Sequence, residues 1–233
     1  MKKQQHRFDI LSLFPNYFTG PFTESIVKRA IDKGIIEIRQ INIRDFAENK
    51  HHRVDDRPFG GGPGMILMPE PVSKAIRSVK TENSKTIYLS PQGQLLTAKK
   101  ARELAAYSHL ILLCGHYEGV DERVIRSDVD EEISIGDYVL TDGCLAAIVL
   151  LNAVIRFIPG TLGHEDAANE DSFENHILDC PHYTKPVVFE GQEVPEVLLS
   201  GNHKLIAEWR KEQALDKTKR VRPDLAIVNK NQT

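Results

Sequence analysis

The stretch of sequence with the clearest chemical potential combines charged side chains with a high density of glycine. Residues 55–65 read DDRPFGGGPGM, so two carboxylates and a guanidinium precede four glycines. Glycine loses more backbone entropy on folding than other residues, and such a run is typical of a loop that bends sharply or approaches a ligand. A Walker-type phosphate loop would continue with Lys and then Ser or Thr, but Met65 and Ile66 follow Gly64. The stretch therefore predicts either a tight turn with positive φ or a loop that lies against a flat or bulky ligand.

Three further segments place glycine beside polar or aromatic side chains directly after apolar runs. They are YLSPQG at 88–93, GHYEGVDER at 115–123 and IGDYVLTDG at 135–143. Each is compatible with an ordinary turn at the end of a strand, with His116 as a capping or solvated residue and Glu118 as a carboxylate at a helix start. The two glycines around His-Tyr-Glu make the second segment the strongest candidate for a binding loop.

Two isolated charged residues have good structural explanations as well as catalytic ones. Arg156 lies near the end of a predicted apolar helix, where its charge complements the helix dipole. Asp171 begins the sequence DSFE, and Glu174 three residues later would complete a capping box. Residue type alone therefore leaves both kinds of role open for each residue.

The apolar periodicity predicts an alternation of strands and helices that would position these segments. Short apolar or alternating runs predict strands at 7–14, 35–43, 85–90, 109–115 and 133–140. Helical spacing, with Gly34 as a C-cap, predicts helices at 21–34, 70–80, 97–107, 121–129 and 143–158. Such alternation is typical of an α/β fold with a mostly parallel sheet covered by helices on both faces. Ligands bind at the carboxyl ends of the strands in these sheets, which is where the three glycine-containing segments fall.

The bulk properties fit a soluble globular protein of one large domain, or one domain with a small appendage. The chain has 233 residues and a net charge of −3, which gives no global basic field for nucleic acid. Cys114, Cys144 and Cys180 are 30 and 36 residues apart, a spacing that suits neither a disulfide framework nor a zinc site and favours a reducing, cytosolic compartment. The N-terminus does not resemble a signal peptide, and the longest apolar run is too short to span a membrane.

The C-terminal third differs in character from the rest of the chain. Residues 161–180 contain six acidic residues and no Lys or Arg, which indicates a flexible acidic linker. Residues 201–230 hold eight Lys or Arg residues against four acids, and the spacing at 203–220 predicts an amphipathic helix. Its basic side chains either form a solvated face or contact phosphate groups. We therefore expect a main domain, a linker and a small mainly helical domain, at 1–162, 163–180 and 181–233.

Eight motifs occur in an order that resembles the bacterial tRNA (guanine-N1)-methyltransferases, the TrmD family of the SPOUT class. They are LSLFP at 11–15, DDRPFGGGPGM at 55–65, YLSPQG at 88–93, CGHYEGVDERV at 114–124, SIGDYVLT at 134–141, RFIPGTLGHE at 156–165, EDSFENHILDCPHYTKP at 170–186 and VPEVLLSGNHKLIAEWR at 194–210. Each motif alone would be a modest match, but the ordered set covers nearly the whole chain.

The resemblance implies a fold and an activity that periodicity could not supply. The implied fold is an α/β domain with a deep C-terminal trefoil knot and a small helical C-terminal domain that grips tRNA. The implied enzyme is a cytoplasmic homodimer, with its active site at the subunit interface, that uses S-adenosylmethionine to methylate N1 of the guanosine immediately 3′ to the anticodon. No membrane or DNA partner is implied. A Mg²⁺ requirement is suspected for the family, but we see no metal-ligand cluster in this sequence and predict no metal site.

The resemblance also implies roles for individual residues. The three glycine-containing segments line the cofactor pocket, through Tyr88, Leu89, Ser90, Pro91, Gln92, Gly93, Gly115, His116, Tyr117, Glu118, Ile135, Gly136, Asp137, Tyr138, Val139, Leu140, Gly143 and Leu145. Asp171 is the general base that takes the proton from N1, and Arg156 stabilises the charge that develops towards O6 of the base. The implied tRNA contacts are Asp55, Asp56, Arg57, Gly61, Gly62, Lys204, Arg210 and Lys211.

The sequence departs from the family pattern beside the third cofactor segment. Residues 142–147 read DGCLAA where the family usually has GGELPA, so Asp142, Cys144 and Ala146 replace a glycine, an acid and a proline. One alternative is therefore a non-catalytic tRNA-binding relative with a weakened cofactor pocket, although Asp171 and Arg156 are retained. A second is a phosphate-loop enzyme, which the missing Lys-Ser/Thr disfavours.

Overall fold

The computed structural model describes residues 5–163 and 171–228 of the chain. It divides into two compact units, Met1–Glu165 and Asp166–Thr233, and each is considered by itself. Of the predicted linker, 164–170 lie outside the described residues and 171–180 are grouped with the second unit. The three-part division at 1–162, 163–180 and 181–233 stays a prediction.

The first unit is built on a five-stranded sheet in which every neighbouring pair is parallel. The strands are β1 (His6–Ser12), β2 (Ile36–Asn42), β5 (Ser84–Leu95), β6 (His109–Cys114) and β7 (Glu131–Ser134). Their order across the sheet is β2-β1-β6-β5-β7. The predicted α/β fold with a parallel sheet flanked by helices is confirmed.

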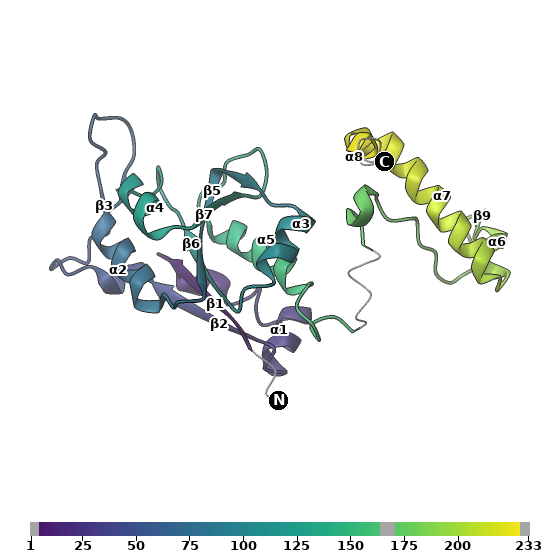
Figure 1. Ribbon diagram of the computed structural model, residues 1–233, viewed down its shortest axis with the longest axis horizontal. Helices are drawn as coiled ribbons and strands as arrows, with labels where there is room; N and C mark the ends of the chain where they lie inside the picture. The colour runs from purple at the N-terminus through teal and green to yellow at the C-terminus, as the bar shows by residue number, and fades with distance from the viewer. Residues whose placement is uncertain (1–4, 164–170, 229–233) are drawn as a thin grey trace. The chain divides into compact units, whose positions relative to one another are not determined.

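Helices cover both faces of this sheet (Figure 1). On one face pack α1 (Ser25–Asp32), α3 (Ala98–Leu104) and α5 (Cys144–Ile155), and on the other α2 (Pro69–Val79) and α4 (Glu122–Asp128). Two short 3₁₀ helices follow strands, η1 (Pro15–Phe18) and η2 (Ile43–Phe46). Each predicted helix in this unit is present within a few residues of its expected bounds. α1 ends at Asp32, two residues before Gly34, whose positive φ is typical of the position that follows the C-cap of a helix.

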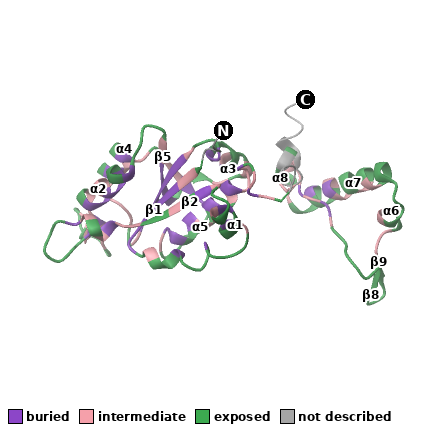
Figure 2. Ribbon diagram, turned by 90° about the horizontal axis from the view of Figure 1, so that it is seen from below, coloured by how far each residue is buried: buried purple, intermediate pink, exposed green. Residues whose placement is uncertain are grey.

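Alternate residues of the central strand belong to two separate cores. On β6, Leu110 and Leu112 pack with the α1, α3 and α5 side, whereas Ile111 and Leu113 pack with the α2 and α4 side. All four are almost fully buried. Figure 2 shows further buried residues, in purple, along β1 and β5. Burial on both faces explains why this strand has an uninterrupted apolar sequence.

Two strand predictions differ from the structure at the carboxyl edge of the sheet. The predicted strand at 133–140 ends at Ser134, because the Ser134 hydroxyl bonds to both the N–H and the C=O of Gly136 and turns the chain away. The predicted strand at 85–90 instead continues as β5 to Leu95, with a bulge that shifts its register against β7.

The glycine-rich stretch forms the loop of a separate two-stranded hairpin. β3 (Asp55–Asp56) pairs antiparallel with β4 (Ile66–Leu67), and we call residues 55–67 the glycine hairpin. Its tip is exposed, and Phe59 is fully exposed. No parallel strand leads into it, which agrees with the sequence argument against a phosphate loop.

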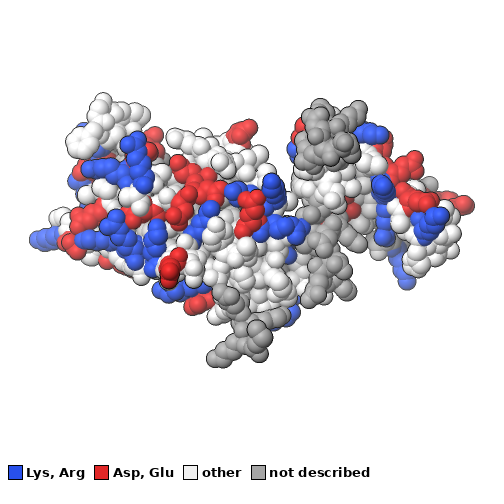
Figure 3. All heavy atoms as spheres, viewed as in Figure 1, with Lys and Arg blue, Asp and Glu red and all other residues white. Residues whose placement is uncertain are grey.

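On the face of the first unit that Figure 3 shows, charged side chains of the two signs are mixed rather than separated. On the face shown in Figure 3, Lys and Arg side chains intermingle with Asp and Glu side chains over the first unit. This distribution fits the small net charge of −3.

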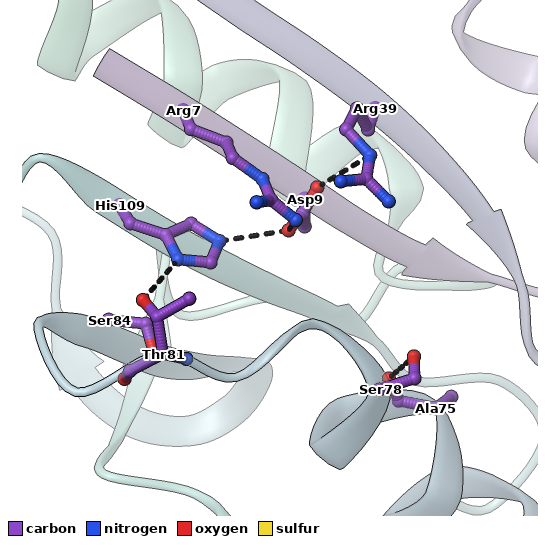
Figure 4. Close-up of polar contacts among 8 residues, drawn as sticks. All are labelled: Arg7, Asp9, Arg39, Ala75, Ser78, Thr81, Ser84 and His109. Atoms are coloured by element: carbon purple, nitrogen blue, oxygen red, sulfur yellow. Dashed lines mark hydrogen bonds and ion pairs between the residues drawn. The ribbon is translucent and has the colours of Figure 1, made fainter. Parts of the chain in front are cut away.

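Asp9 is a charged side chain buried completely in the middle of β1 (Figure 4). Its Oδ2 accepts hydrogen bonds from His109 Nε2 at 2.8 Å and Arg7 Nη2 at 2.5 Å, and Arg39 Nε lies 3.5 Å from its Oδ1. The other ring nitrogen of His109 lies 3.0 Å from Thr81 Oγ1. The cluster therefore joins β1, β2 and the amino-terminal end of β6 by charge-assisted bonds.

The second unit is mainly helical. It contains η4 (Glu174–His176), the hairpin strands β8 (Val188–Phe189) and β9 (Gln192–Glu193), and the helices α6 (Glu196–Leu199), α7 (His203–Val221) and α8 (Pro223–Val228). The helix predicted at 203–220 is present as α7, but a continuous apolar face is not, since Ala214 and Thr218 are its buried residues. The Thr218 hydroxyl accepts a hydrogen bond from Leu178 N at 2.8 Å, which ties residues near 178 to this helix.

No helix among the described residues is both long enough and apolar enough to cross a membrane.

Candidate functional site

A cavity of about 210 Å³ opens at the carboxyl ends of β5, β6 and β7. Its walls come from the three glycine-containing segments, of which 88–93 forms the bulged part of β5 and the other two follow β6 and β7. The lining residues are Tyr88, Leu89, Ser90, Pro91, Gln92, Gly115, His116, Tyr117, Glu118, Gly119, Ile133, Ser134, Ile135, Gly136, Tyr138, Val139, Leu140, Thr141, Asp142, Gly143 and Ala146. The position agrees with the rule that parallel sheets bind ligands at this edge.

The predicted cofactor residues line this cavity with three exceptions. Gly93, Asp137 and Leu145 are outside the lining. Gly93 instead lies against the Glu132 backbone, where an added β-carbon would come within 2.4 Å. Six further lining residues were not among the predicted cofactor contacts: Gly119, Ile133, Ser134, Thr141, Asp142 and Ala146. Gly119, Ser134, Thr141 and Asp142 lie inside the quoted motifs or glycine-containing segments, whereas the sequence signal for Ile133 and Ala146 was only their closeness to predicted residues.

The third loop is fixed against the second by backbone contacts. Gly143 N donates a hydrogen bond to Gly115 O at 2.9 Å, and a bridge pairs His116 with Asp142. A β-carbon at Gly143 would lie 2.9 Å from the Cys114 Cα, so only glycine permits this approach. The start of α5 is therefore held directly against the end of β6.

Asp142 bonds the first backbone N–H of α5 although the sequence departs from the family at this position. Its Oδ1 accepts a hydrogen bond from Cys144 N at 2.7 Å. The carboxylate also belongs to the cavity wall, where Glu118 is the other acidic side chain. The replacement of glycine by Asp142 thus preserves the turn and adds a negative charge to the cavity.

Aromatic rings form much of the remaining wall. Burial, followed by the nearby charge of Glu132, raises the pKa of Tyr88 to about 12, so this phenol stays protonated. The His116 ring contacts Phe14 and Tyr117 edge-on, with centroids 5.1 and 4.3 Å apart. His116 Nδ1 is buried and has no hydrogen-bond partner within the protein, which leaves a polar atom available to a ligand.

Two of the three free cysteines lie behind the cavity. Cys114 and Cys144 are both buried, and the Cys144 thiol is 3.2 Å from Ser12 Oγ. Burial, with a smaller contribution from a hydrogen bond to Cys144, raises the pKa of Cys114 well above its ordinary value. These thiols therefore behave as packing groups rather than nucleophiles.

The predicted catalytic pair is divided between the two units. Arg156 is the residue that follows α5 in the first unit, and it is half-buried. Asp171 is a half-buried residue of the second unit. The structure shows where each residue lies within its own unit. It does not test whether the two residues act together in catalysis.

The predicted tRNA contacts are exposed or nearly so. On the glycine hairpin, Asp56 pairs with Arg53 at 2.6 Å and also accepts a hydrogen bond from Arg57 N. Asp55 belongs to β3, and Gly61 and Gly62 are exposed in the tip. On α7, exposed side chains include Lys204, Arg210 and Lys211.

Comparison with known proteins decides the family. Residues 6–228 match the family described as tRNA (Guanine-1)-methyltransferase TrmD. The chain belongs to this family. The tRNA (guanine-N(1)-)-methyltransferase of Protochlamydia amoebophila is 69% identical over 217 residues, which make up 93% of this chain and 98% of that protein.

Two longer relatives carry the same name. The proteins of Chlamydia pneumoniae and Chlamydia abortus are 63% and 61% identical to this chain over 221 residues. The alignments cover 95% of this chain but 61% and 62% of those proteins, so the chain spans less than two thirds of their length. Family and relatives together confirm the resemblance drawn from the eight motifs and identify the chain as a methyltransferase.

One group of potential metal ligands occurs in the described part of this methyltransferase. Side-chain atoms of Asp179, Cys180 and His182 lie within 4.8 Å of one another. His182 Nε2 already bonds Asp179 Oδ2 at 2.8 Å, and burial, followed by the charge of Asp179, raises the pKa of Cys180. Mg²⁺ prefers several oxygen ligands, and this group offers one carboxylate beside a protonated thiol. This group is therefore not a suitable site for the Mg²⁺ ion that the family resemblance suggested.

Proposed function

We propose that this methyltransferase transfers the methyl group of S-adenosylmethionine to N1 of the guanosine at position 37 of tRNA, immediately 3′ to the anticodon. The observation that carries the proposal is the cavity. Three loops that are separate in the sequence, and that the motifs marked as a cofactor site, line one space at the carboxyl edge of the sheet. The names of the relatives supply the substrate class.

The lining fits S-adenosylmethionine by shape and charge. Apolar side chains such as Leu89 and Ile135 suit the adenine ring, and the carboxylates of Glu118 and Asp142 suit a ligand with a positive sulfonium. When bound, this cofactor supplies a methyl group that is already activated. The protein has only to orient the reactants and move one proton, so no covalent enzyme intermediate is needed.

Asp171 and Arg156 supply the remaining chemistry in this proposal. Guanine N1 carries a proton and is a weak nucleophile, so a carboxylate within hydrogen-bond reach increases the rate by accepting that proton. Negative charge then develops towards O6, where a fixed guanidinium stabilises the transition state by about 3–4 kcal/mol. The retained DSFE and RFIPG motifs support these two roles.

The tRNA would be held by phosphate contacts from the second unit. The exposed Lys204, Arg210 and Lys211 side chains of α7 fit that role, and such contacts position a nucleic acid without reading its sequence. The affinity for tRNA should therefore fall steeply as salt is raised. A base that reaches the cavity must leave its stack. The exposed residues Asp56, Arg57, Gly61 and Gly62 of the glycine hairpin offer a surface for it.

We further propose the SPOUT class and its trefoil knot for the first unit. The supporting feature is the segment before α5, which the Gly143–Gly115 hydrogen bond and the His116–Asp142 bridge hold across the end of β6. A trefoil knot in this region requires the chain to cross the end of a neighbouring strand in this way.

A homodimer with its active site at the subunit interface completes the proposal. α5 is apolar around most of its circumference, yet Leu145 and Val149 are 43% and 45% exposed on one stripe. An apolar stripe at this spacing is typical of a helix that packs against a partner. We therefore propose a second copy of the chain as the partner.

Methyl transfer to a tRNA transcript tests the proposed function directly. The transcript should accept labelled methyl groups from S-adenosylmethionine when guanosine occupies position 37 and should accept none when adenosine replaces it. Binding of the transcript without any transfer would instead favour a non-catalytic relative. Transfer to the adenosine variant would contradict the proposed target.

A further inference from the structure

The glycine hairpin is joined by its backbone to the second loop of the cavity. Glu118 N donates a hydrogen bond to Met65 O at 3.0 Å, and Leu67 N donates one to Gly119 O at 2.9 Å. Glu118 and Gly119 are both lining residues. The descending arm of the hairpin therefore forms part of the frame that holds this wall of the cavity.

Gly64 lies in contact with the Glu118 side chain. A β-carbon at Gly64 would be 2.5 Å from both Cγ and Oε1 of Glu118. Non-bonded heavy atoms need about 3.5 Å, so a β-carbon and this side-chain position exclude each other. The carboxylate of Glu118 thus rests where any other residue at position 64 would place its side chain.

The tip of the hairpin offers a natural comparison. Gly60 has a φ of +87° and Gly64 a φ of +80°, so both adopt the left-handed backbone that favours glycine. An added β-carbon at Gly60, however, would meet no atom within 4 Å. Backbone strain is therefore shared by the two positions, whereas displacement of Glu118 is specific to Gly64.

We propose that Gly64 is a positioning residue that seats the Glu118 carboxylate at the wall of the cofactor cavity. The inference rests on the proposed function, because that function makes Glu118 a contact of the positively charged cofactor. It also assigns the C-terminal end of the glycine hairpin to the cofactor side, whereas the family resemblance gave the hairpin only tRNA contacts, from Asp55 to Gly62. In a Gly64→Ala variant the backbone bonds still hold the loop, so the Glu118 side chain itself must rotate away.

The test is a double-mutant cycle read by calorimetric titration with S-adenosylmethionine. The variants are Gly64→Ala, Glu118→Ala and the double variant, with Gly60→Ala as the control for backbone strain. We expect Gly64→Ala to weaken binding about tenfold, the size of one charged hydrogen bond, and Gly60→Ala to leave the affinity unchanged. In the Glu118→Ala background, Gly64→Ala should have almost no further effect, because the group it displaces is gone.

Thermal unfolding of each variant verifies that the compared proteins are folded. Equal losses in Gly64→Ala and Gly60→Ala would overturn the inference, since they would assign the effect to backbone strain. Independent, additive losses for Gly64→Ala and Glu118→Ala would overturn it as well. If the parent chain bound no S-adenosylmethionine, the proposed function would be wrong. If the parent bound it and Gly64→Ala bound it with the same affinity, only the positioning role of Gly64 would be wrong.

Discussion

At the scale of single residues, the cavity is distinguished by the sign of its charge. Among the described lining residues, the side chains of the Asp, Glu, Lys and Arg types are Glu118 and Asp142, and both are acidic. S-adenosylmethionine carries a positive sulfonium, whereas the product left after transfer has a neutral thioether at the same place. If S-adenosylmethionine binds here as proposed, the two carboxylates in the wall would favour it over the neutral product.

Replacement of Asp142 by Asn tests this electrostatic preference. The amide oxygen can still accept the hydrogen bond from Cys144 N, so this contact with the start of α5 is kept while the charge is lost. We expect the affinity for S-adenosylmethionine to fall about fivefold, as for a partly screened charge pair, and the affinity for S-adenosylhomocysteine to stay constant. Calorimetric titration with each ligand measures the ratio of the two affinities. The control is Asp121→Asn, which alters the N-cap of α4 outside the cavity lining. An equal loss of affinity for both ligands in Asp142→Asn would contradict the charge argument.

Asp171 is the residue whose removal should separate binding from chemistry. In Asp171→Asn the side chain keeps its shape but no longer accepts the N1 proton, so the rate of transfer should fall at least about 100-fold. The affinity for S-adenosylmethionine should be unchanged, because the cavity is complete without this residue. Single-turnover transfer and calorimetry measure the two quantities, with the exposed Asp216→Asn on α7 as control. A folded Asp171→Asn enzyme with the parental rate would rule out the general-base role.

At the scale of elements, the sequence predicted the strands and helices whose apolar residues repeat with a regular period. It did not predict the strand ends and bulges that depend on individual side-chain contacts and on tertiary pairing. The runs around Leu110 and Val154 gave a buried strand and an apolar helix because burial sets their pattern over many residues. The end of β7 depends on one hydroxyl, that of Ser134, which replaces a ladder bond with a local one. The β5 bulge and the two-residue strands of the glycine hairpin likewise follow from tertiary pairing that no local pattern encodes.

The same distinction applies to the candidate site. Recognisable motifs located its three loops, because their glycines and polar residues are contiguous in the chain. The family pattern has a glycine where this chain has Asp142, so the motifs gave no reason to count that carboxylate as lining. The contact between Gly64 and Glu118 joins residues 54 positions apart (118 − 64) and becomes visible only when β4 pairs beside the second loop.

Asp128 connects α4 to α2 on one face of the sheet. Burial alone would raise its pKa, but hydrogen bonds from Arg77, Ser73 and Ser127 outweigh this and hold the pKa below the ordinary value. A depressed carboxyl pKa stabilises the fold at pH values above the unfolded pKa of about 3.9, and the stabilisation is lost as pH falls through the folded pKa.

Asp128→Asn should therefore destabilise the first unit in a pH-dependent way. At pH 7 we expect a loss of about 1–3 kcal/mol in the free energy of unfolding, because a buried charged hydrogen-bond acceptor becomes neutral. The difference from the parent should narrow below about pH 4, where the parental carboxylate also gains its proton. Urea unfolding at several pH values measures this. Asp32→Asn, at an exposed pair with Lys28, is the control, and a pH-independent loss at Asp128 would argue against the ionic contribution.

At the scale of the whole molecule, the two units divide the work that the proposed function requires. The first unit carries the cavity, the glycine hairpin and Arg156, and the second carries Asp171 and the basic α7. Within a single chain the proposed base, Asp171, and the proposed guanidinium, Arg156, belong to separate compact units. In the proposed dimer a second copy would lie next to the cavity, because the exposed stripe of α5 begins at Leu145, two residues after the lining segment 138–143, and continues to Val149.

Val149→Glu tests whether the α5 stripe is the dimer interface. A charge at the centre of an apolar interface is costly to bury, whereas the same charge on an isolated chain stays in water. We expect the parent to sediment as a dimer of 52.6 kDa (2 × 26.3) and the variant as a 26.3 kDa monomer, with methyl transfer lost. Val221→Glu, at an exposed valine of α7, should leave the dimer intact. Because the α5 residues that face the core are unchanged, the monomer should keep its helical content by circular dichroism, so lost transfer would come from the missing partner rather than from unfolding. A dimeric, fully active Val149→Glu enzyme would place the interface elsewhere and leave the stripe unexplained.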